Sequence, residues 1–253
     1  MEKKEKQVSN QGNFSFRVTV CRMTGREHQK QNMPCEDVLY IRETPGFSFY
    51  GIADGQSGTS RGAEGGMACL EAVAAYVQSY GIRNMACMRF PDEGPYMIMR
   101  EIRKTLLTLS EKEKCDCREY ASTIVAVAID SVTGIYAVIH LGDGCALGVQ
   151  NDDVITVLSS PEQHFSGSHT WLTTSENAVS HLRLIFGCIH GKKRLILMTD
   201  GATCLCKGKH VSEKALTLLL NEAGEEVSNY LMCSNPRDDA CCIVIDCSEK
   251  ARV

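Results

Sequence analysis

The sequence lacks the features that mark several large classes of protein. No run of eighteen apolar residues occurs, so we expect no membrane-spanning helix. The formal net charge of −4 gives no excess of positive charge for binding nucleic acid or acidic membranes. Residues 1–12 are rich in Lys, Glu and Gln without an apolar core, which predicts a disordered lead-in and not a signal peptide. These absences favour a cytoplasmic protein with neither nucleic-acid nor membrane partners.

Cysteine, by contrast, is abundant, with fourteen residues. Without a secretion signal we do not expect disulfides, and cysteines in apolar runs, such as Cys69 and Cys241, predict small buried side chains. Two Cys-x-Cys pairs, Cys115/Cys117 and Cys204/Cys206, could bind zinc. Neither has the Cys-x2-Cys spacing of common zinc sites, so buried or surface thiols are the favoured interpretation.

The pattern of apolar residues predicts a layered α+β domain over residues 13–253, because no repeat or long linker divides the chain. Period-two alternation and β-branched runs predict strands at 14–22, 38–42, 47–53, 121–129, 135–141, 145–149, 154–158, 182–189, 194–199 and 240–246. Helical periodicity predicts helices at 60–80, 95–112, 212–222 and 225–231. Two antiparallel sheets flanked by helices, a four-layer α/β/β/α sandwich, would bury this pattern.

A short turn at Pro45-Gly46 separates the second and third of these strands and predicts a hairpin. Glu36 and Asp37 precede one strand of the hairpin, and Asp54 ends the other. Antiparallel pairing would therefore place these acidic residues at the same end of one sheet.

Four acidic motifs adjoin apolar strands in this way. They are Glu36-Asp37, Asp54-Gly55, Asp200-Gly201 and Asp238-Asp239. Carboxylates gathered at one end of a sheet would repel each other unless cations neutralised them, and oxygen ligands select hard ions such as Mg²⁺ or Mn²⁺. Two such ions about 3.5–4 Å apart can activate water for phosphoryl displacement, and Asp54 is the best-placed bridging ligand. The alternatives are unrelated Asp-Gly turns, or a nuclease or polymerase site.

Five short motifs give the chain a family resemblance. They are Phe49–Gly55, Ala121–Thr123, Gly142–Gly144, Leu197–Gly201 and Asp238-Asp239. Their order and spacing resemble those of the PP2C-type, metal-dependent Ser/Thr protein phosphatases, over about residues 14–247. The segment with His28 and Pro34–Asp37, together with Trp171–Thr174, is similar to the shorter bacterial branch of that family.

The resemblance implies a site with two Mn²⁺ or Mg²⁺ ions. The implied metal-binding residues are Glu36, Asp37, Asp54, Gly55, Asp200 and Asp238. Asp54 would bridge both ions, and Gly55 would lend its carbonyl. Asp200 and Asp238 would complete the first ion's ligands, and the pair Glu36 and Asp37 would serve the second ion directly or through water. The implied reaction is attack of a metal-bridged hydroxide on phosphoserine or phosphothreonine, without a phosphoenzyme.

The chain departs from the family pattern in two roles, those of the general acid and of the arginine that binds the substrate phosphate. Gln56 stands where the family has a histidine proposed as the general acid, and glutamine is no useful proton donor. His28 or solvent would take that catalytic role, although an isolated loop histidine such as His28 is more often a surface residue. The arginine that binds the substrate phosphate has no clear counterpart, which leaves Arg26 and Lys30 as candidates.

A third metal ion is not clearly implied. The family's third-metal aspartate falls near Arg118 and Glu119, so Asp116 or Glu119 would have to replace it. Asp143 is predicted to close the Gly-Asp-Gly turn as a structural residue.

The resemblance predicts an enzyme of bacterial signalling that acts on a phosphorylated protein and works opposite a cognate Ser/Thr kinase. Two alternatives remain. One is a pseudophosphatase that uses the same fold as a binding or regulatory module, and the other is a phosphatase of small phosphorylated molecules.

Overall fold

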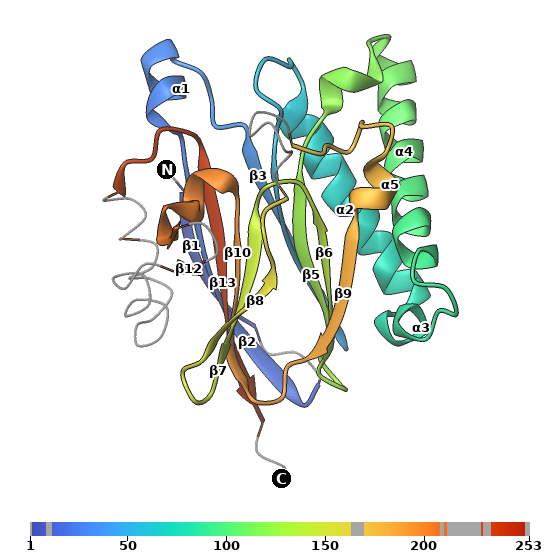
Figure 1. Ribbon diagram of the computed structural model, residues 1–253, viewed down its shortest axis with the longest axis vertical. Coiled ribbons are helices and arrows are strands. Elements are labelled where there is room, and N and C mark those ends of the chain that lie inside the picture. The colour runs from blue at the N-terminus through green and yellow to red at the C-terminus, as the bar shows by residue number, and fades with distance from the viewer. Residues whose placement is uncertain are drawn as a thin grey trace.

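Two antiparallel sheets are stacked face to face, and helices cover the outer face of one of them (Figure 1). The computed structural model describes residues 12–162, 170–202, 229 and 234–250, and the backbone of 2–8, 203–207 and 210–211. The first sheet has the order β1 (Glu2–Val8), β2 (Phe14–Met23), β13 (Ala240–Glu249), β10 (Lys192–Met198), β7 (Cys145–Gln150) and β8 (Ile155–Ser159). The second has the order β3 (Asp37–Thr44), β4 (Phe47–Asp54), β5 (Ile124–Asp130), β6 (Ile135–Leu141) and β9 (Arg183–Cys188).

Two long helices pack on the second sheet. The described α-helices are α1 (Arg26–Gln31), α2 (Gly62–Tyr80), α3 (Ile82–Ala86), α4 (Glu93–Glu113) and α5 (Ala178–His181). Short segments complete the list: the 3-10 helices η1 (Cys117–Tyr120) and η2 (Asp200–Leu205), and the paired strands β11 (Cys206–Lys207) and β12 (His210–Val211). None of the helices in this part of the chain is both long and apolar enough to span a membrane.

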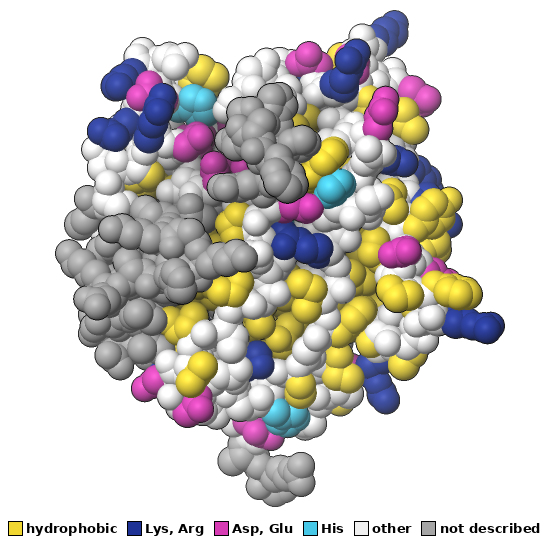
Figure 2. All heavy atoms as spheres, in the orientation of Figure 1, with side chains coloured by type: hydrophobic (Ala, Val, Ile, Leu, Met, Phe, Trp, Pro, Cys, Tyr) yellow, Lys and Arg dark blue, Asp and Glu magenta, His cyan; other side chains and the backbone are white. Residues whose placement is uncertain are grey.

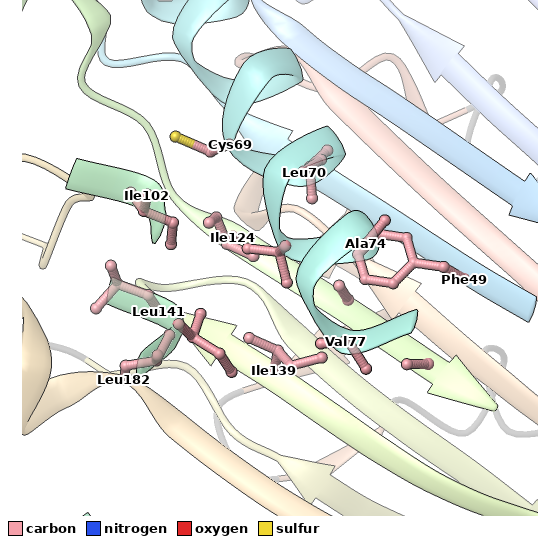
Figure 3. Packing of buried hydrophobic residues seen from close by; sticks show 14 of the residues in the cluster. Phe49, Cys69, Leu70, Ala74, Val77, Ile102, Ile124, Ile139, Leu141 and Leu182 are labelled. Atoms are coloured by element: carbon pink, nitrogen blue, oxygen red, sulfur yellow. The ribbon is translucent and has the colours of Figure 1, made fainter. Parts of the chain in front are cut away.

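The core has two main layers because the second sheet is buried on both faces. Along β4, Phe49 packs with α2 residues such as Leu70 and Val77 (Figure 3). The neighbouring residues Tyr50 and Ile52 face the first sheet instead. Successive side chains of a strand point to opposite faces, so the apolar run of β4 fills both layers. Each such fully buried side chain stabilises the fold by about 1.5–3 kcal/mol.

The predicted α+β fold with two antiparallel sheets is confirmed. The hairpin across Pro45-Gly46 is also confirmed, with Asp37 paired to Asp54 at one end and Thr44 to Phe47 at the other. The helices expected at 212–222 and 225–231, which would cover the outer face of the first sheet, lie outside the described residues.

Two segments differ from the sequence-based expectation. Glu2–Val8, predicted to be a disordered lead-in, forms β1 along the edge of β2. Edge pairing satisfies backbone groups without needing an apolar side-chain pattern, so the sequence carries no sign of it. Residues 25–35, where the sequence pattern predicts neither a strand nor a helix, contain the six-residue helix α1, none of whose residues is buried. A helix without a buried face has no apolar periodicity to reveal it.

Candidate active site

Asp37 and Asp54 occupy opposite positions at one end of the β3–β4 hairpin. The backbone of Asp54 is held by Thr123, whose N–H donates to the Asp54 carbonyl (2.9 Å) and whose Oγ1 accepts from the Asp54 N–H (3.0 Å). Asp37 is fully buried, and its Oδ2 accepts a hydrogen bond from Thr199 Oγ1 (2.7 Å). Its Oδ1 is also buried and has no hydrogen-bond donor within the described residues. Among the described residues, the pair therefore presents a buried carboxylate oxygen, Asp37 Oδ1, without a hydrogen-bond donor.

Gly55 lets the backbone after Asp54 run close to the start of α2. A Cβ at this position would lie 2.7 Å from the backbone of both Gly62 and Ala63. The Gly55 N–H also donates to the Glu36 carbonyl (3.3 Å). The Asp54-Gly55 turn is thus fixed against β3 and α2 at once, and only glycine fits this approach.

The acids at this end of the sheets raise each other's pKa values. Burial is the main cause in each case, because it disfavours the charged form. The pKa of Asp37 is raised to about 8, and that of Asp200 to about 6. The pKa of Asp54 is raised well above 3.8, first by burial and then by the charges of Asp37, Asp200 and Asp238. Asp143 adds to the negative charge around Asp54 and Asp200. Such a cluster favours uptake of protons or of cations.

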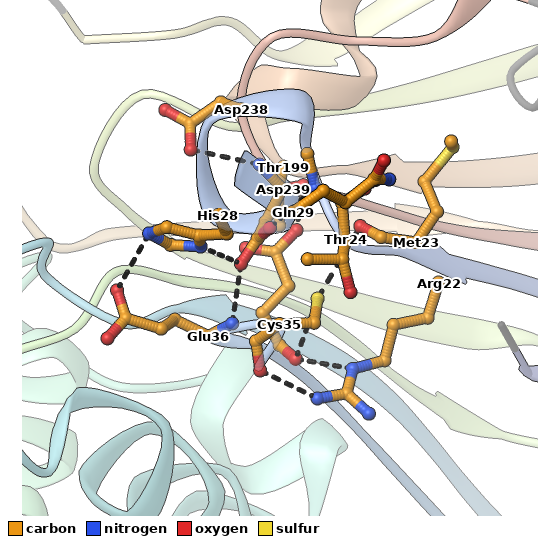
Figure 4. Close-up of polar contacts among 12 residues, drawn as sticks. Arg22, Met23, Thr24, His28, Gln29, Cys35, Glu36, Thr199, Asp238 and Asp239 are labelled. Carbon is orange, nitrogen blue, oxygen red and sulfur yellow. Dashed lines mark hydrogen bonds and ion pairs between the residues drawn. The ribbon is translucent and has the colours of Figure 1, made fainter. Parts of the chain in front are cut away.

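Asp238 and Asp239 precede β13 and point in different directions (Figure 4). Asp238 is exposed, and its Oδ1 accepts from the Asp239 N–H (2.9 Å). Asp239 is only 2% exposed and accepts hydrogen bonds from Gly25 N (2.7 Å), His28 Nδ1 (2.9 Å) and Glu36 N (2.5 Å). Sequence reasoning treated the two acids as one metal motif and assigned no role to Asp239. Because successive side chains of a strand point to opposite faces, the position of the two acids directly before β13 is the sequence feature that predicts different directions for them.

His28 lies in the acidic cluster and not on an open surface loop. Its side chain is 12% exposed, with Nδ1 on Asp239 and Nε2 3.8 Å from Glu36 Oε2. Burial alone lowers the pKa of His28, but the hydrogen bond and charge of Asp239, with the charges of Glu36 and Asp238, outweigh it. The pKa of His28 is therefore raised, which favours the protonated imidazolium.

The two phosphate-binding candidates, Arg26 and Lys30, lie exposed on α1. Lys30 pairs with Glu27 (3.1 Å). Figure 2 shows basic, acidic and histidine side chains gathered at the end of the molecule where α1 lies. Gln56, in the exposed loop after Gly55, is held through its backbone N–H on the Ala121 carbonyl (2.9 Å). Within the part of the chain that the structure describes, neither Arg26 nor Lys30 makes an ion pair with Asp37 or Asp54, and the carboxylate that Lys30 meets is that of Glu27.

The alternatives considered for a third metal are engaged elsewhere. Asp116 caps η1 by accepting from the Arg118 N–H (2.9 Å), and it also pairs with the Arg118 guanidinium. Glu119 Oε2 accepts from both the N–H and the hydroxyl of Ser60 (3.0 and 2.9 Å). Of the Cys-x-Cys pairs considered for zinc, Cys115 Sγ donates to Tyr120 Oη (3.5 Å), and the side chains of Cys204 and Cys206 lie outside the described residues. Asp116, Glu119 and Cys115 therefore each have a structural partner.

The donors fit a hard divalent cation in type. They are carboxylate oxygens, and the unsatisfied buried Asp37 Oδ1 opposite Asp54 is an atom that a cation would neutralise. Across the described ranges, however, His, Cys, Asp and Glu side chains form no ready-made group of three that could hold a metal ion.

Comparisons with known proteins agree with this architecture. The family model for Protein phosphatase 2C matches residues 24–232. Serine/threonine phosphatase Stp1 from Staphylococcus aureus has a similar fold (14% identity, TM-score 0.66, covering 96% of this chain and 99% of that one). RsbX in complex with magnesium also has a similar fold (14% identity, TM-score 0.61, covering 97% of this chain and 100% of that one). The same holds for PppA, a regulatory component of T6SS in Pseudomonas aeruginosa (14% identity, TM-score 0.62, covering 96% of this chain and 100% of that one). A search of curated proteins gave no significant match.

Proposed function

Because the chain belongs to the Protein phosphatase 2C family, we propose that it hydrolyses phosphoserine and phosphothreonine in proteins with the help of divalent cations. The observation that carries this proposal is the Asp37–Asp54 pair, which lies at a strand end with a buried carboxylate oxygen that has no donor among the described residues. Similar phosphatase folds, including the magnesium complex of RsbX, support it. The proposed substrate is a phosphoprotein, with a cognate kinase as the opposing enzyme and the cytoplasm as the location.

Two Mn²⁺ or Mg²⁺ ions would be held by oxygen atoms at this end of the sheets. The proposed ligands are Glu36, Asp37, Asp54, the Gly55 carbonyl, Asp200 and Asp238. When bound, such ions neutralise the carboxylates, activate water and stabilise charge on the phosphoryl group.

The residues of the chain supply orientation and a proton. Thr123 fixes the backbone of Asp54, and Thr199 fixes one carboxylate oxygen of Asp37, so neither acid has to reorganise during the reaction. His28 is the proposed general acid: the Asp239 carboxylate holds Nδ1, and Nε2–H, which lies 3.8 Å from Glu36 Oε2, would protonate the departing serine or threonine oxygen. Arg26 and Lys30 on α1 are the proposed contacts for the phosphate.

The test is hydrolysis of a phosphoserine peptide by the Asp54→Asn variant with Mn²⁺ or Mg²⁺ present. We expect loss of nearly all metal-dependent activity with an unchanged circular dichroism spectrum. Asp92→Asn is the matched control, since Asp92 is exposed at the start of α4 and makes no capping hydrogen bond there. Full activity in the Asp54→Asn variant would refute the proposal.

A pseudophosphatase is the second candidate, favoured by Gln56 in place of a histidine beside the acidic cluster. Calorimetric titration with Mn²⁺, run alongside the peptide assay, separates the two. Metal binding without hydrolysis would indicate a binding module, whereas hydrolysis of p-nitrophenyl phosphate but not of phosphopeptides would indicate a small-molecule phosphatase.

A further inference from the structure

Helix α1 has no N-terminal cap from its own sequence. Gly25 occupies the N-cap position and offers no side chain, so the first N–H groups of the helix need acceptors from elsewhere. The segment before β13 provides them: the N–H groups of Gly25, Arg26 and Glu27 donate to Asp239 Oδ1 (2.7 Å), the Pro236 carbonyl (3.1 Å) and the Arg237 carbonyl (3.2 Å), respectively. The position of α1 is therefore set by residues more than two hundred positions away in the chain.

The second oxygen of the same carboxylate reaches the start of β3. Asp239 Oδ2 accepts from Glu36 N (2.5 Å) and from His28 Nδ1 (2.9 Å). One buried side chain thus joins α1, the start of β3 and the start of β13 (Figure 4). Both residues on Oδ2 belong to the proposed reaction, one as a metal ligand and the other as the proton donor.

Arg22 on β2 holds the same segment from another direction. Its Nε donates to the Asp37 carbonyl (2.6 Å) and its Nη2 to the Cys35 carbonyl (2.9 Å). With Asp239 on the Glu36 N–H, three consecutive residues are fixed through their backbones. Charge-assisted hydrogen bonds of this kind are stronger and more directional than neutral ones.

We propose that Asp239 is a positioning residue of the active site, which sets the placement of Glu36 and His28 relative to the Asp37–Asp54 pair without binding metal itself. The catalytic part of this inference rests on the proposed phosphatase function. The structural part does not, because the hydrogen bonds exist whether or not the protein is an enzyme.

Hydrogen exchange in the full-length protein tests the structural part. We expect the Glu36 and Gly25 amides in Asp239→Ala to exchange about 10- to 100-fold faster than in the wild type, as loss of hydrogen bonds to a charged acceptor implies. Asp239→Asn keeps one acceptor oxygen, so at least one of the two amides should stay protected. Asp246→Asn, the same change at the far end of β13 where the acid pairs with Arg194, should leave both amides protected. Unchanged protection in Asp239→Ala would overturn the proposal.

Kinetics of the same variants test the catalytic part. We expect Asp239→Asn to lower kcat for a phosphopeptide about 10- to 100-fold, as loss of groups that support metal ligands does, with KM changed less than threefold. Asp246→Asn should retain wild-type kcat even if its melting temperature falls. An unchanged kcat in Asp239→Ala, the variant in which both amides are expected to lose protection, would overturn the positioning role. Inactivity of the wild type would instead refute the phosphatase proposal and leave the exchange result valid.

Discussion

Asp37 and Asp54 face each other across the β3–β4 ladder, with Asp37 bonded to Thr199 through one oxygen and left without a described donor at the other. A slip of one residue in this register would send one of the two side chains to the opposite face of the sheet. The Pro45-Gly46 turn at the far end of the hairpin fixes the register, and so fixes the pair. The pairing of Asp37 with Asp54 therefore depends on a turn that lies eight residues away from each of them.

Replacing Asp37 should stabilise the metal-free protein while abolishing metal-dependent activity. The folded pKa of Asp37 is about 8 against an ordinary 3.8, so between these values the folded state binds more protons than the unfolded state. Stability without metal must then fall as pH rises from 4 to 8. We expect Asp37→Asn at pH 8 to gain at least about 1 kcal/mol, roughly 2–4 °C in melting temperature. Thermal melts in a chelator at pH 5 and pH 8 measure this. An equal gain at both values would contradict the assigned cause.

The hydroxyl group of Thr199 should contribute more to the free energy of unfolding than its methyl group does. Thr199 Oγ1 donates to Asp37 and accepts from Cys241 N (2.9 Å), so Thr199→Val leaves two buried polar groups without a partner. We expect a loss of about 1–3 kcal/mol in urea unfolding. Thr199→Ser keeps the hydroxyl and is the matched control, with a loss of less than half that of the valine variant. Equal losses in the two variants would show that packing of the methyl group dominates.

His28 should determine the alkaline side of the pH–rate profile. As a proton donor it acts only when protonated, so the rate should fall as pH rises through its pKa, which lies above the ordinary 6.5. We expect His28→Gln to lower kcat about 10²-fold at pH 6.5 and to remove this alkaline decline. Steady-state assays between pH 6 and 9 provide the comparison. If the variant keeps the wild-type decline, solvent or another group is the donor.

Gly55 should not tolerate even one methyl group. A Cβ there would meet the Gly62 and Ala63 backbone at 2.7 Å, so Gly55→Ala must displace either the Asp54 turn or the start of α2. We expect destabilisation of about 1–3 kcal/mol by differential scanning calorimetry. Gly148→Ala is the control, because its methyl would meet only side chains, at 3.1 Å or more. Comparable effects of the two changes would argue against the tight approach at Gly55.

The arrangement of His28 could not be predicted from its neighbours in sequence. Sequence reasoning left it as either a catalytic group or a surface histidine, because a polar six-residue segment gives no pattern that fixes a side chain. Its low exposure and its polar contacts come from Asp239 and Glu36, the residues that directly precede β13 and β3. The sequence also gives no separate role to Asp239, because two adjacent acids form a single motif in it.

Sequence patterns alone were enough to predict the strands β2–β10 and β13, their antiparallel sandwich, and the acids that lie next to the ends of these strands. These follow from local rules, namely alternation along strands, turn residues between them, and acids placed where apolar runs stop. Only the tertiary structure decided what each acid does. Gly25 and Asp239 are 214 residues apart, yet their contact orients α1 and separates Asp239 from the otherwise similar Asp238. Such a contact depends on how distant strands come to lie beside each other, and the pattern of either segment alone does not contain it.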